Sequence, residues 1–315
     1  MPLRHQGLPR HDARTEALKT MSLPMLHWGT EALWQQLEPL LPGLSVEVVP
    51  ATRSTNTMLL ERARALPDTA SDSGDVIVGR SIESAAFGRR AIDLQPCLLV
   101  AEHQTAGRGR QGRVWQSAAG ASLTFSLALP LAATDWSGLS LAVGVAVARA
   151  LEKEGFGGID LKWPNDLVFR HHKLGGILIE VNGDALGPST VVVGVGINAR
   201  MPREVRREIA QPVTDLQTVA GRGAKPVDRN RVLARLIAEV ASMLAAYAEH
   251  GFAPIAAEWQ QRHAYQGKPV KLVLPDGAAV KGTVAGVDAS GALVLADGPR
   301  RSRFLSGELS LRRGN

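Results

Sequence analysis

The chain has 315 residues, a hydrophobic fraction of 45%, a charged fraction of 21% and a formal net charge of +6. This length and composition predict a soluble globular protein that can carry one large domain and one small one. Its single cysteine, Cys97, excludes an intrachain disulfide, a thiolate zinc site and a CxxC redox motif, and favours the reducing cytoplasm. The longest apolar stretch, 139–151, is too short for the about 20 residues of a membrane helix, and the basic N-terminus lacks the apolar core of a signal peptide. The positive charge favours anionic partners without choosing between nucleic acids, nucleotides and carboxylates.

The first 95 residues alternate between irregular and regular segments. Residues 1–27 lack periodicity and predict a loose tail. A short helix is expected from Thr30 to Leu41, with Thr30 as its N-cap and Pro42–Gly43 as its stop, and a strand follows over Ser45–Val49. Residues 67–95 have no clear period and are interpreted as a surface insertion.

A polar triplet, Ser54-Thr55-Asn56, leads into a helical run over Met58–Leu66. Ser, Thr and Asn side chains accept hydrogen bonds from the free N–H groups of a helix N-terminus. Two interpretations of the triplet therefore stay open, helix capping and contact with a ligand.

The most informative segment is the loop Gly107–Arg113, GRGRQGR. Its glycines let the backbone approach a ligand, and each arginine offers a planar fork of donors for carboxylate or phosphate oxygens. The loop lies between an apolar strand, Pro96–Ala101, and an alternating one, Ser122–Leu127. The simpler alternative is a solvated basic turn or a phosphate-binding patch. A nucleotide triphosphatase phosphate loop is excluded, because Gly112 is followed by Arg113-Val114 and not by Lys and Ser or Thr.

The rest of the chain predicts a mixed α and β core followed by an all-β end. Helices are expected over Leu139–Glu154 and Val227–His250, the second bridging toward the C-terminal module. Short alternating strands with glycine turns from Lys268 onward predict a small β-barrel. The remaining predicted elements are a strand at Ile159–Leu161, a tight turn at Lys162–Asp166, and strands around Leu167–Phe169, Gly176–Val181 and Thr190–Val195.

Four ordered motifs resemble those of the biotin protein ligases: GRGRQGR, KWPND at 162–166, KLGGIL at 173–178 and GVGIN at 194–198. The segments 286–288, 291–293 and 307–312 look like the family's C-terminal barrel, so the resemblance covers about residues 45–315. It implies an α+β fold, with a mixed sheet and flanking helices as catalytic core and a small C-terminal SH3-like β-barrel. The implied division is an N-terminal extension with one short helix and no helix-turn-helix (1–44), a catalytic domain (45–266) and the barrel (267–315).

The resemblance implies an enzyme that activates biotin with ATP, as its magnesium complex, to biotinyl-5′-AMP. Biotin would then pass to a lysine of a biotin carboxyl carrier protein, such as that of acetyl-CoA carboxylase. No membrane partner is expected. No DNA partner and no repressor role are expected either, because a helix-turn-helix needs about 60 residues of compact helices and the N-terminal extension covers only 1–44. A homodimer is left open.

The family also implies roles for individual residues of this chain. Lys173, Arg110 and Asp166 would be catalytic, with Asp166 either a magnesium ligand or an acceptor of the amine proton, and no separate resident metal site is expected. Biotin contacts would come from Ser54, Thr55, Asn56, Gln104, Gly107, Arg108, Gly109, Arg110, Lys173, Gly176 and Gly194. ATP contacts would come from Arg110, Arg113, Lys162, Asn165, Asn198 and Arg312.

Three rival functions are weighed. A lipoate or octanoyl ligase shares the core fold but is not expected to carry GRGRQGR or KWPND. A dinucleotide-binding oxidoreductase is suggested by Gly194–Ala199, which fits GxGxxA with Asp215 about 20 residues on. A basic nucleic-acid-binding protein is disfavoured by an aromatic content of 4%, too low for many stacking platforms.

Overall fold

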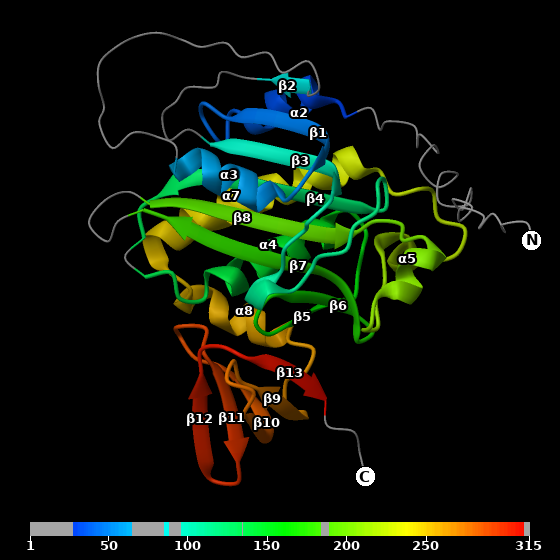
Figure 1. Cartoon of the computed structure of the whole chain (residues 1–315). Helices are drawn as coiled ribbons and strands as arrows, with labels where there is room; N and C mark the ends of the chain where they lie inside the picture. Colours follow the sequence, from blue (N-terminus) through cyan, green and yellow to red (C-terminus); the bar gives the residue numbers. More distant parts are fainter. Residues whose placement is uncertain (1–27, 65–84, 88–95, 134, 184–188, 312–315) are drawn as a thin grey trace, which may run out of the picture.

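The computed structural model describes residues 28–64, 85–87, 96–133, 135–183 and 189–311 (Figure 1). A large mixed sheet carries helices on both faces, and a smaller antiparallel sheet forms the C-terminal end of the described chain. The predicted α+β class with a small C-terminal β module is confirmed. The predictions for residues 1–27, and for most of 67–95, lie outside the described residues, and the domain boundaries stay predictions.

The large sheet has eight strands, and β1 and β3 are its parallel pair. All its other pairings are antiparallel, so the sheet is mixed as expected. Its strands in spatial order are β2 (Ala85–Phe87), β1 (Ser45–Thr52), β3 (Cys97–Gln104), β4 (Ser122–Leu131), β8 (Ser189–Asn198), β7 (His172–Asn182), β6 (Asp166–Phe169) and β5 (Ile159–Lys162).

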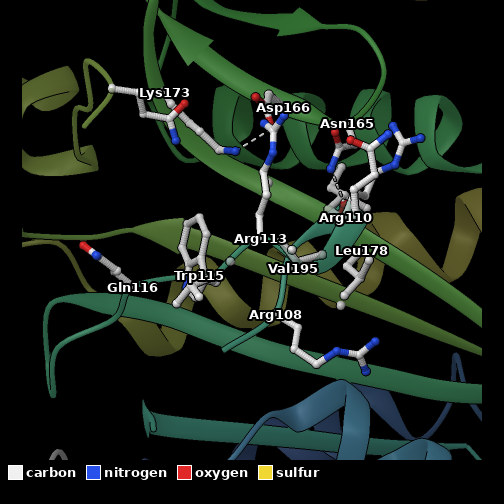
Figure 2. Close-up of a pocket in the computed structure, with 18 of the residues that line it drawn as sticks. Arg108, Arg110, Arg113, Trp115, Gln116, Asn165, Asp166, Lys173, Leu178 and Val195 are labelled. Atoms are coloured by element: carbon white, nitrogen blue, oxygen red, sulfur yellow. Dashed lines mark hydrogen bonds and ion pairs between the residues drawn. The ribbon is translucent and has the colours of Figure 1, made fainter. Parts of the chain in front are cut away.

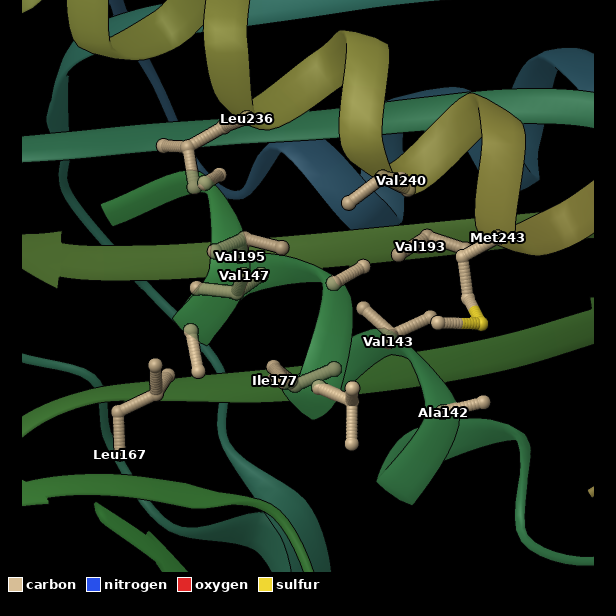
Figure 3. Packing of buried hydrophobic residues seen from close by; sticks show 14 of the residues in the cluster. Ala142, Val143, Val147, Leu167, Ile177, Val193, Val195, Leu236, Val240 and Met243 are labelled. Atoms are coloured by element: carbon tan, nitrogen blue, oxygen red, sulfur yellow. The ribbon is translucent and has the colours of Figure 1, made fainter. Parts of the chain in front are cut away.

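One face of this sheet carries the main hydrophobic core. Helix α2 (Thr30–Leu37) packs on β1, α7 (Arg229–His250) on β4, and α4 (Leu139–Lys153) on β5 to β7, with α4 and α7 also packed together. Figure 3 shows Val143 and Val147 of α4 meeting Leu236 and Val240 of α7 and the strand residues below them. Alternate strand residues point to this side because the side-chain period of a strand is two.

The opposite face is covered only in part. Helix α3 (Thr55–Arg64) lies across β3, β4, β7 and β8, in front of the sheet in Figure 1. Its Leu59 and Leu60 pack against Leu99 and Val192 in a second, smaller core. The glycine positions Gly194 and Gly196 of β8 lie on this face, the first next to Asn56 of α3 and the second next to Trp115. The remaining short helices are α5 (Arg203–Glu208), α6 (Leu216–Ala220), α8 (Ala256–Gln261) and the 3₁₀ turns η1 (Arg110–Gly112) and η2 (Ala253–Ile255).

The first helix is shorter than predicted. It ends at Leu37 instead of Leu41, because Pro39 has no N–H to continue the hydrogen-bond ladder and the following residues form turns. Its N-cap is Gly29 and not Thr30, whose hydroxyl donates to the carbonyl of Trp28 at 3.2 Å.

The fold decides two further interpretations of the sequence, one expected connection and one rival motif. Helix α7 does not bridge to the C-terminal module, since it lies along α4 and it is α8 that contacts β10. The GxGxxA pattern is not a dinucleotide loop, because Gly194–Asn198 belongs wholly to β8 and no helix starts at the glycines. The oxidoreductase alternative has no structural basis here.

The C-terminal sheet has the order β12-β11-β10-β9-β13 and is antiparallel throughout. Its strands are β9 (Pro269–Val273), β10 (Ala279–Val287), β11 (Leu293–Asp297), β12 (Arg300–Phe304) and β13 (Glu308–Leu311). The sequence analysis missed β12, because an exposed edge strand rich in arginine has no apolar alternation.

The small sheet is held to the core by a close backbone contact. The indole N–H of Trp163 donates to the carbonyl of Gly291 at 3.1 Å, and Trp163 is buried. Gly291 and Gly138 both have positive φ, and a Cβ on Gly291 would lie 2.7 Å from the Cα of Gly138. Only glycine fits this contact.

None of the described helices is long and apolar enough to cross a membrane.

The buried imidazole of His263 gives a pH test of this architecture. It packs 4.5 Å from the ring of Trp259, and within the described residues neither ring nitrogen has a hydrogen-bond partner. Burial lowers the pKa of His263 from 6.5 to about 4. Between these values the unfolded chain binds a proton that the folded chain does not, so stability falls as the pH drops below 6.5.

We therefore expect this residue to cost about 2 kcal/mol of unfolding free energy between pH 7.5 and pH 5.0. Urea unfolding of the wild type and of His263→Gln at both pH values measures this contribution. It is the loss of unfolding free energy in the wild type between the two pH values minus the loss in the variant. Equal losses in the two proteins would contradict the buried, neutral imidazole.

Candidate active site

A cavity of about 490 Å³ opens on the α3 face of the large sheet. The loop after β3, the β5–β6 turn, residues 208–213 and the start of β13 surround it. Of the residues predicted for the site, it is lined by Ser54, Thr55, Asn56, Gln104, Arg108, Gly109, Arg110, Arg113, Lys162, Asn165, Asp166, Lys173, Gly176, Gly194 and Asn198. Gly107 does not line the cavity, and Arg312 lies outside the described residues.

The floor of the cavity follows from the alternation of β8. Val193, Val195 and Ile197 point into the main core, so Gly194 and Gly196 face the opposite side. A Cβ on Gly194 would lie 2.1 Å from Oδ1 of Asn56, and one on Gly196 would lie 2.7 Å from the indole of Trp115. The two glycines therefore make room for an amide and an aromatic ring on the sheet.

One end of the cavity is a buried polar nest. The backbone N–H of Thr55 donates to Oε1 of Gln104 at 2.8 Å, and Oγ of Ser126 lies 2.6 Å from both Oγ1 of Thr55 and Oδ1 of Asn56. Ser54 also accepts from the N–H of Thr57, at a long 3.5 Å. Ser54 thus caps the helix weakly, while Thr55 and Asn56 turn their side chains to the sheet. Gln104 uses its amide oxygen for Thr55, which leaves its Nε2 as a donor, while Oδ1 of Asn56 and the hydroxyl oxygens can each accept a further hydrogen bond, so the nest offers both donors and acceptors to a polar ring.

The three arginines of the loop have different surroundings. Arg108 donates to Oε1 of Glu180 at 3.0 Å, and Arg113 forms a bidentate ion pair with Glu308. Arg110 is half-buried and forms no ion pair within the described part of the chain. Burial lowers the pKa of the Arg110 guanidinium, against the attraction of Asp166. Arg110 is therefore the arginine with the most to gain from an incoming anion.

The other end of the cavity places two lysines on one carboxylate. Nζ of Lys173 lies 2.7 Å from Oδ1 of Asp166, and Nζ of Lys162 lies 4.0 Å from Oδ2 (Figure 2). Burial lowers the pKa of Lys162, and the same carboxylate opposes this shift. Two ammonium groups and the free guanidinium of Arg110 share this end, so it can hold more than one negative charge.

Glycines and amides shape this charged end. Gly175 is required by strand pairing, since a Cβ there would lie 2.6 Å from the carbonyl oxygen of Gly196. Gly176 instead faces the Asp166–Lys173 pair. A Cβ on Gly176 would lie 3.6 Å from Oδ1 of Asp166 and 3.6 Å from Nζ of Lys173. Asn165 uses its Nδ2 to donate to the carbonyl of Ile177 at 2.7 Å, and Asn198 donates to the carbonyl of Thr214 at 2.9 Å.

Gly107 has a role in the backbone of the loop. The N–H of Trp115 donates to its carbonyl at 2.8 Å, and a Cβ on Gly107 would lie 2.5 Å from the carbonyl oxygen of Trp115. The glycine therefore permits the close approach that brings Trp115 back onto the sheet.

Sequence reasoning missed several lining residues. Trp115 stands half-buried against the cavity, with an indole Nε1 that is buried without a partner among the described residues. Its place directly after the basic loop was the available signal. Glu308 lies in the segment 307–312, where the resemblance implied a contact only from Arg312. Glu208 and the residues up to 213 had no signal, because they end and follow a short helix of no clear pattern.

No three His, Cys, Asp or Glu side chains of the described residues converge on a metal site. Magnesium in nucleotide sites takes one or two carboxylates together with phosphate oxygens. The donor set of the cavity fits an ion of that kind, with Asp166 as the carboxylate placed beside the cations.

Comparison with known proteins gives this geometry a family. Residues 89–198 match the Biotin/lipoate A/B protein ligase family, and residues 265–312 match the Biotin protein ligase C terminal domain. The fold and the site define the class of the protein, which is a biotin/lipoate ligase core followed by a biotin protein ligase C-terminal domain. The bifunctional ligase/repressor BirA of Escherichia coli K12 is 35% identical over 274 residues, which are 86% of this chain and 75% of that protein.

A second relative, the biotin–[acetyl-CoA-carboxylase] ligase of Mycobacterium tuberculosis, is 32% identical over 290 residues, 89% of this chain and 91% of the relative. The chain therefore belongs to the biotin protein ligase family. A solved structure of the biotin protein ligase from Aquifex aeolicus with biotin and ATP superposes with a TM-score of 0.63 at 27% identity. That match covers 85% of this chain and 99% of the other.

The contact between Gly194 and Asn56 generates a stability prediction. In Gly194→Ala the new methyl group displaces the Asn56 amide, and we expect a loss of about 1–3 kcal/mol of unfolding free energy. Gly157→Ala is the matched control, because Gly157 has ordinary backbone angles and no atom within 4 Å of its position for a Cβ, so its stability should not fall. Urea unfolding measures the stability of both variants. A midpoint of Gly194→Ala equal to that of the wild type would contradict the contact.

Proposed function

We propose that the protein joins biotin to ATP and then transfers biotin to a carrier protein. In the first step a carboxylate oxygen of biotin attacks the α-phosphorus of ATP, forming biotinyl-5′-AMP and releasing pyrophosphate. In the second step the ε-amine of a lysine on a biotin carboxyl carrier protein attacks the anhydride carbonyl. The amine loses a proton, AMP leaves, and biotin is joined to the lysine through an amide bond.

The observation that carries the proposal is the gathering of Lys173, Lys162 and Arg110 around Asp166 in the cavity that also holds the polar nest. Two anions have to meet in the first step, and at 4 Å their repulsion is roughly 4 kcal/mol at an effective dielectric of 20. Fixed cations offset this repulsion and hold the reacting atoms in line. No enzyme nucleophile is needed, because positioning and charge stabilisation suffice.

The two ends of the cavity suggest how the substrates lie. The nest of Ser54, Thr55, Asn56 and Gln104 supplies both donors and acceptors, as the ureido ring of biotin requires. The carboxylate would then point to Lys173, with the α-phosphate beside Arg110. Lys162, Arg113, Asn165 and Asn198 would surround the rest of the nucleotide, with Arg312 as a further contact from the C-terminal end. The indole of Trp115 adds a flat surface next to that region.

Magnesium would arrive with ATP and screen the charge of the leaving pyrophosphate. Asp166 is the proposed protein ligand, because it already lies between the two lysines assigned to the phosphate end. The sequence left a second role open, acceptance of the amine proton in the transfer step.

The relatives support biotin as substrate over lipoate or octanoate. The Mycobacterium tuberculosis relative, which matches 89% of the chain, is named as a biotin ligase, and the C-terminal match is to a biotin protein ligase domain. The carrier protein as acceptor, the cytoplasmic location and the absence of operator binding remain predictions. A gel shift with the gene's own promoter and biotinyl-5′-AMP tests the last of these.

Exchange of radiolabelled pyrophosphate into ATP tests the first step. We expect exchange only when biotin is present, with lipoate and octanoate inactive. Lys173→Ala and Arg110→Ala should each lower the exchange rate by about 100-fold or more, since each removes a cation from the reacting charges. Lys281→Ala, which changes an exposed lysine of β10 in the C-terminal sheet, is the matched control and should keep full activity. Biotin-independent exchange, or none at all in folded protein, would refute the proposal.

The role of Asp166 is tested with the isosteric change Asp166→Asn. If Asp166 is a magnesium ligand, the substitution should slow exchange and raise the Mg²⁺ concentration needed for half-maximal exchange by about 10-fold. The measurement is exchange rate against Mg²⁺ concentration at saturating biotin and ATP. An unchanged Mg²⁺ dependence, with only the transfer to the carrier lysine slowed, would instead make Asp166 the proton acceptor.

A further inference from the structure

Glu180 on β7 lies beneath the polar nest but has no part in the function proposed so far. Its two carboxylate oxygens serve two different partners. Oε2 accepts from Nδ2 of Asn56 at 3.0 Å, and Oε1 accepts from a guanidinium nitrogen of Arg108 at 3.0 Å. One side chain therefore joins the nest to the glycine and arginine loop.

The first contact decides which way the Asn56 amide faces. Nδ2 donates both to Glu180 and to the carbonyl of Leu178 at 3.1 Å, while Oδ1 lies 2.6 Å from Oγ of Ser126. An ionised carboxylate only accepts hydrogen bonds, so it binds the NH₂ side of the amide and turns the oxygen toward the sheet and Gly194. The nest then presents a defined acceptor at this point.

The second contact ties the loop down at its first arginine. Arg108 donates to Glu180 and also to Oγ1 of Thr57 at 3.2 Å, so it links the loop to β7 and to the first turn of α3. Figure 2 shows its side chain extending away from Arg110, Asp166 and Lys173. Arg108 is thus placed to fasten the loop instead of meeting the phosphates.

We propose that Glu180 is a positioning residue that latches the Gly107–Arg113 loop over the biotin end of the cavity and orients Asn56 beneath it. This inference rests on the proposed function, since the latch would hold biotin and biotinyl-5′-AMP in place until the acceptor lysine arrives. The Arg108 and Glu180 side chains are 47% and 21% exposed, and such a pair adds little to global stability. Its effect is therefore expected on ligand retention and not on folding.

The experiment measures how fast the enzyme loses radiolabelled biotinyl-5′-AMP, formed in place and chased with unlabelled compound in the absence of acceptor. Glu180→Gln and Arg108→Met should each release it about 5- to 20-fold faster and raise the KM for biotin to a similar degree. The kcat of exchange at saturating biotin should stay within about 2-fold in Glu180→Gln, because Glu180 does not line the cavity. Because one latch is removed in either case, the double variant should be no faster than the faster single variant.

Two controls separate the latch from a merely structural role. Glu61→Gln removes an exposed carboxylate on α3 and should behave as the wild type. Raising KCl to about 0.5 M should speed release from the wild type by a larger factor than from Glu180→Gln, because it screens the exposed pair in addition to the phosphate contacts that both proteins keep.

Release rates of both single variants within 2-fold of the wild type would overturn the inference, and so would effects that multiply in the double variant. The variant Arg108→Met keeps the test decisive if Glu180→Gln does not fold. A wild type without biotin-dependent exchange refutes the proposed function itself, so the two failures are distinguishable.

Discussion

The structure depends above all on holding several positive charges close together in one half-buried cavity. Each of three cations has its own carboxylate, supplied by a different element: Lys173 has Asp166 from β6, Arg108 has Glu180 from β7, and Arg113 has Glu308 from β13. These pairs reduce repulsion that would otherwise oppose folding of the site. Arg110 alone among the loop arginines has no such partner in the described chain, and burial lowers its pKa. An anionic substrate therefore completes an arrangement of charge that is already in place.

The mixed sheet supplies the rigidity for this arrangement. Among the described elements, its core face is covered by α2, α4 and α7, while its other face carries α3 and the loop that brings Trp115 onto Gly196. Because successive residues of a strand point to opposite faces, Val193 and Val195 can build the core while Gly194 and Gly196 form the floor of the cavity. Packing and site thus share the same strand, and a substitution on one face is felt on the other.

The C-terminal sheet is part of the site and not an appendage. It is fastened by Trp163 of the KWPND turn to Gly291, and Glu308 reaches the loop arginine Arg113 from the opposite side. The turn that carries Lys162 and Asp166 is therefore held between the two sheets. This placement gives a physical reason why a catalytic core and a small β module occur together in one chain.

The sequence by itself determined the fold class, most helices and strands, and many of the residues that line the cavity, because strand and helix periodicity and the four ordered motifs are local properties. The end of α2 at Leu37 was missed although Pro39 is itself a local signal. The edge strand β12 and the inclusion of Gly194–Asn198 in β8 were not determined, because pairing with neighbouring strands outweighs local preference there. Nor could the sequence show which carboxylate pairs with which arginine, since Glu180 and Glu308 lie 72 and 195 residues from their partners. Only the tertiary structure decided those pairings, because they depend on distances in space that no spacing along the chain encodes.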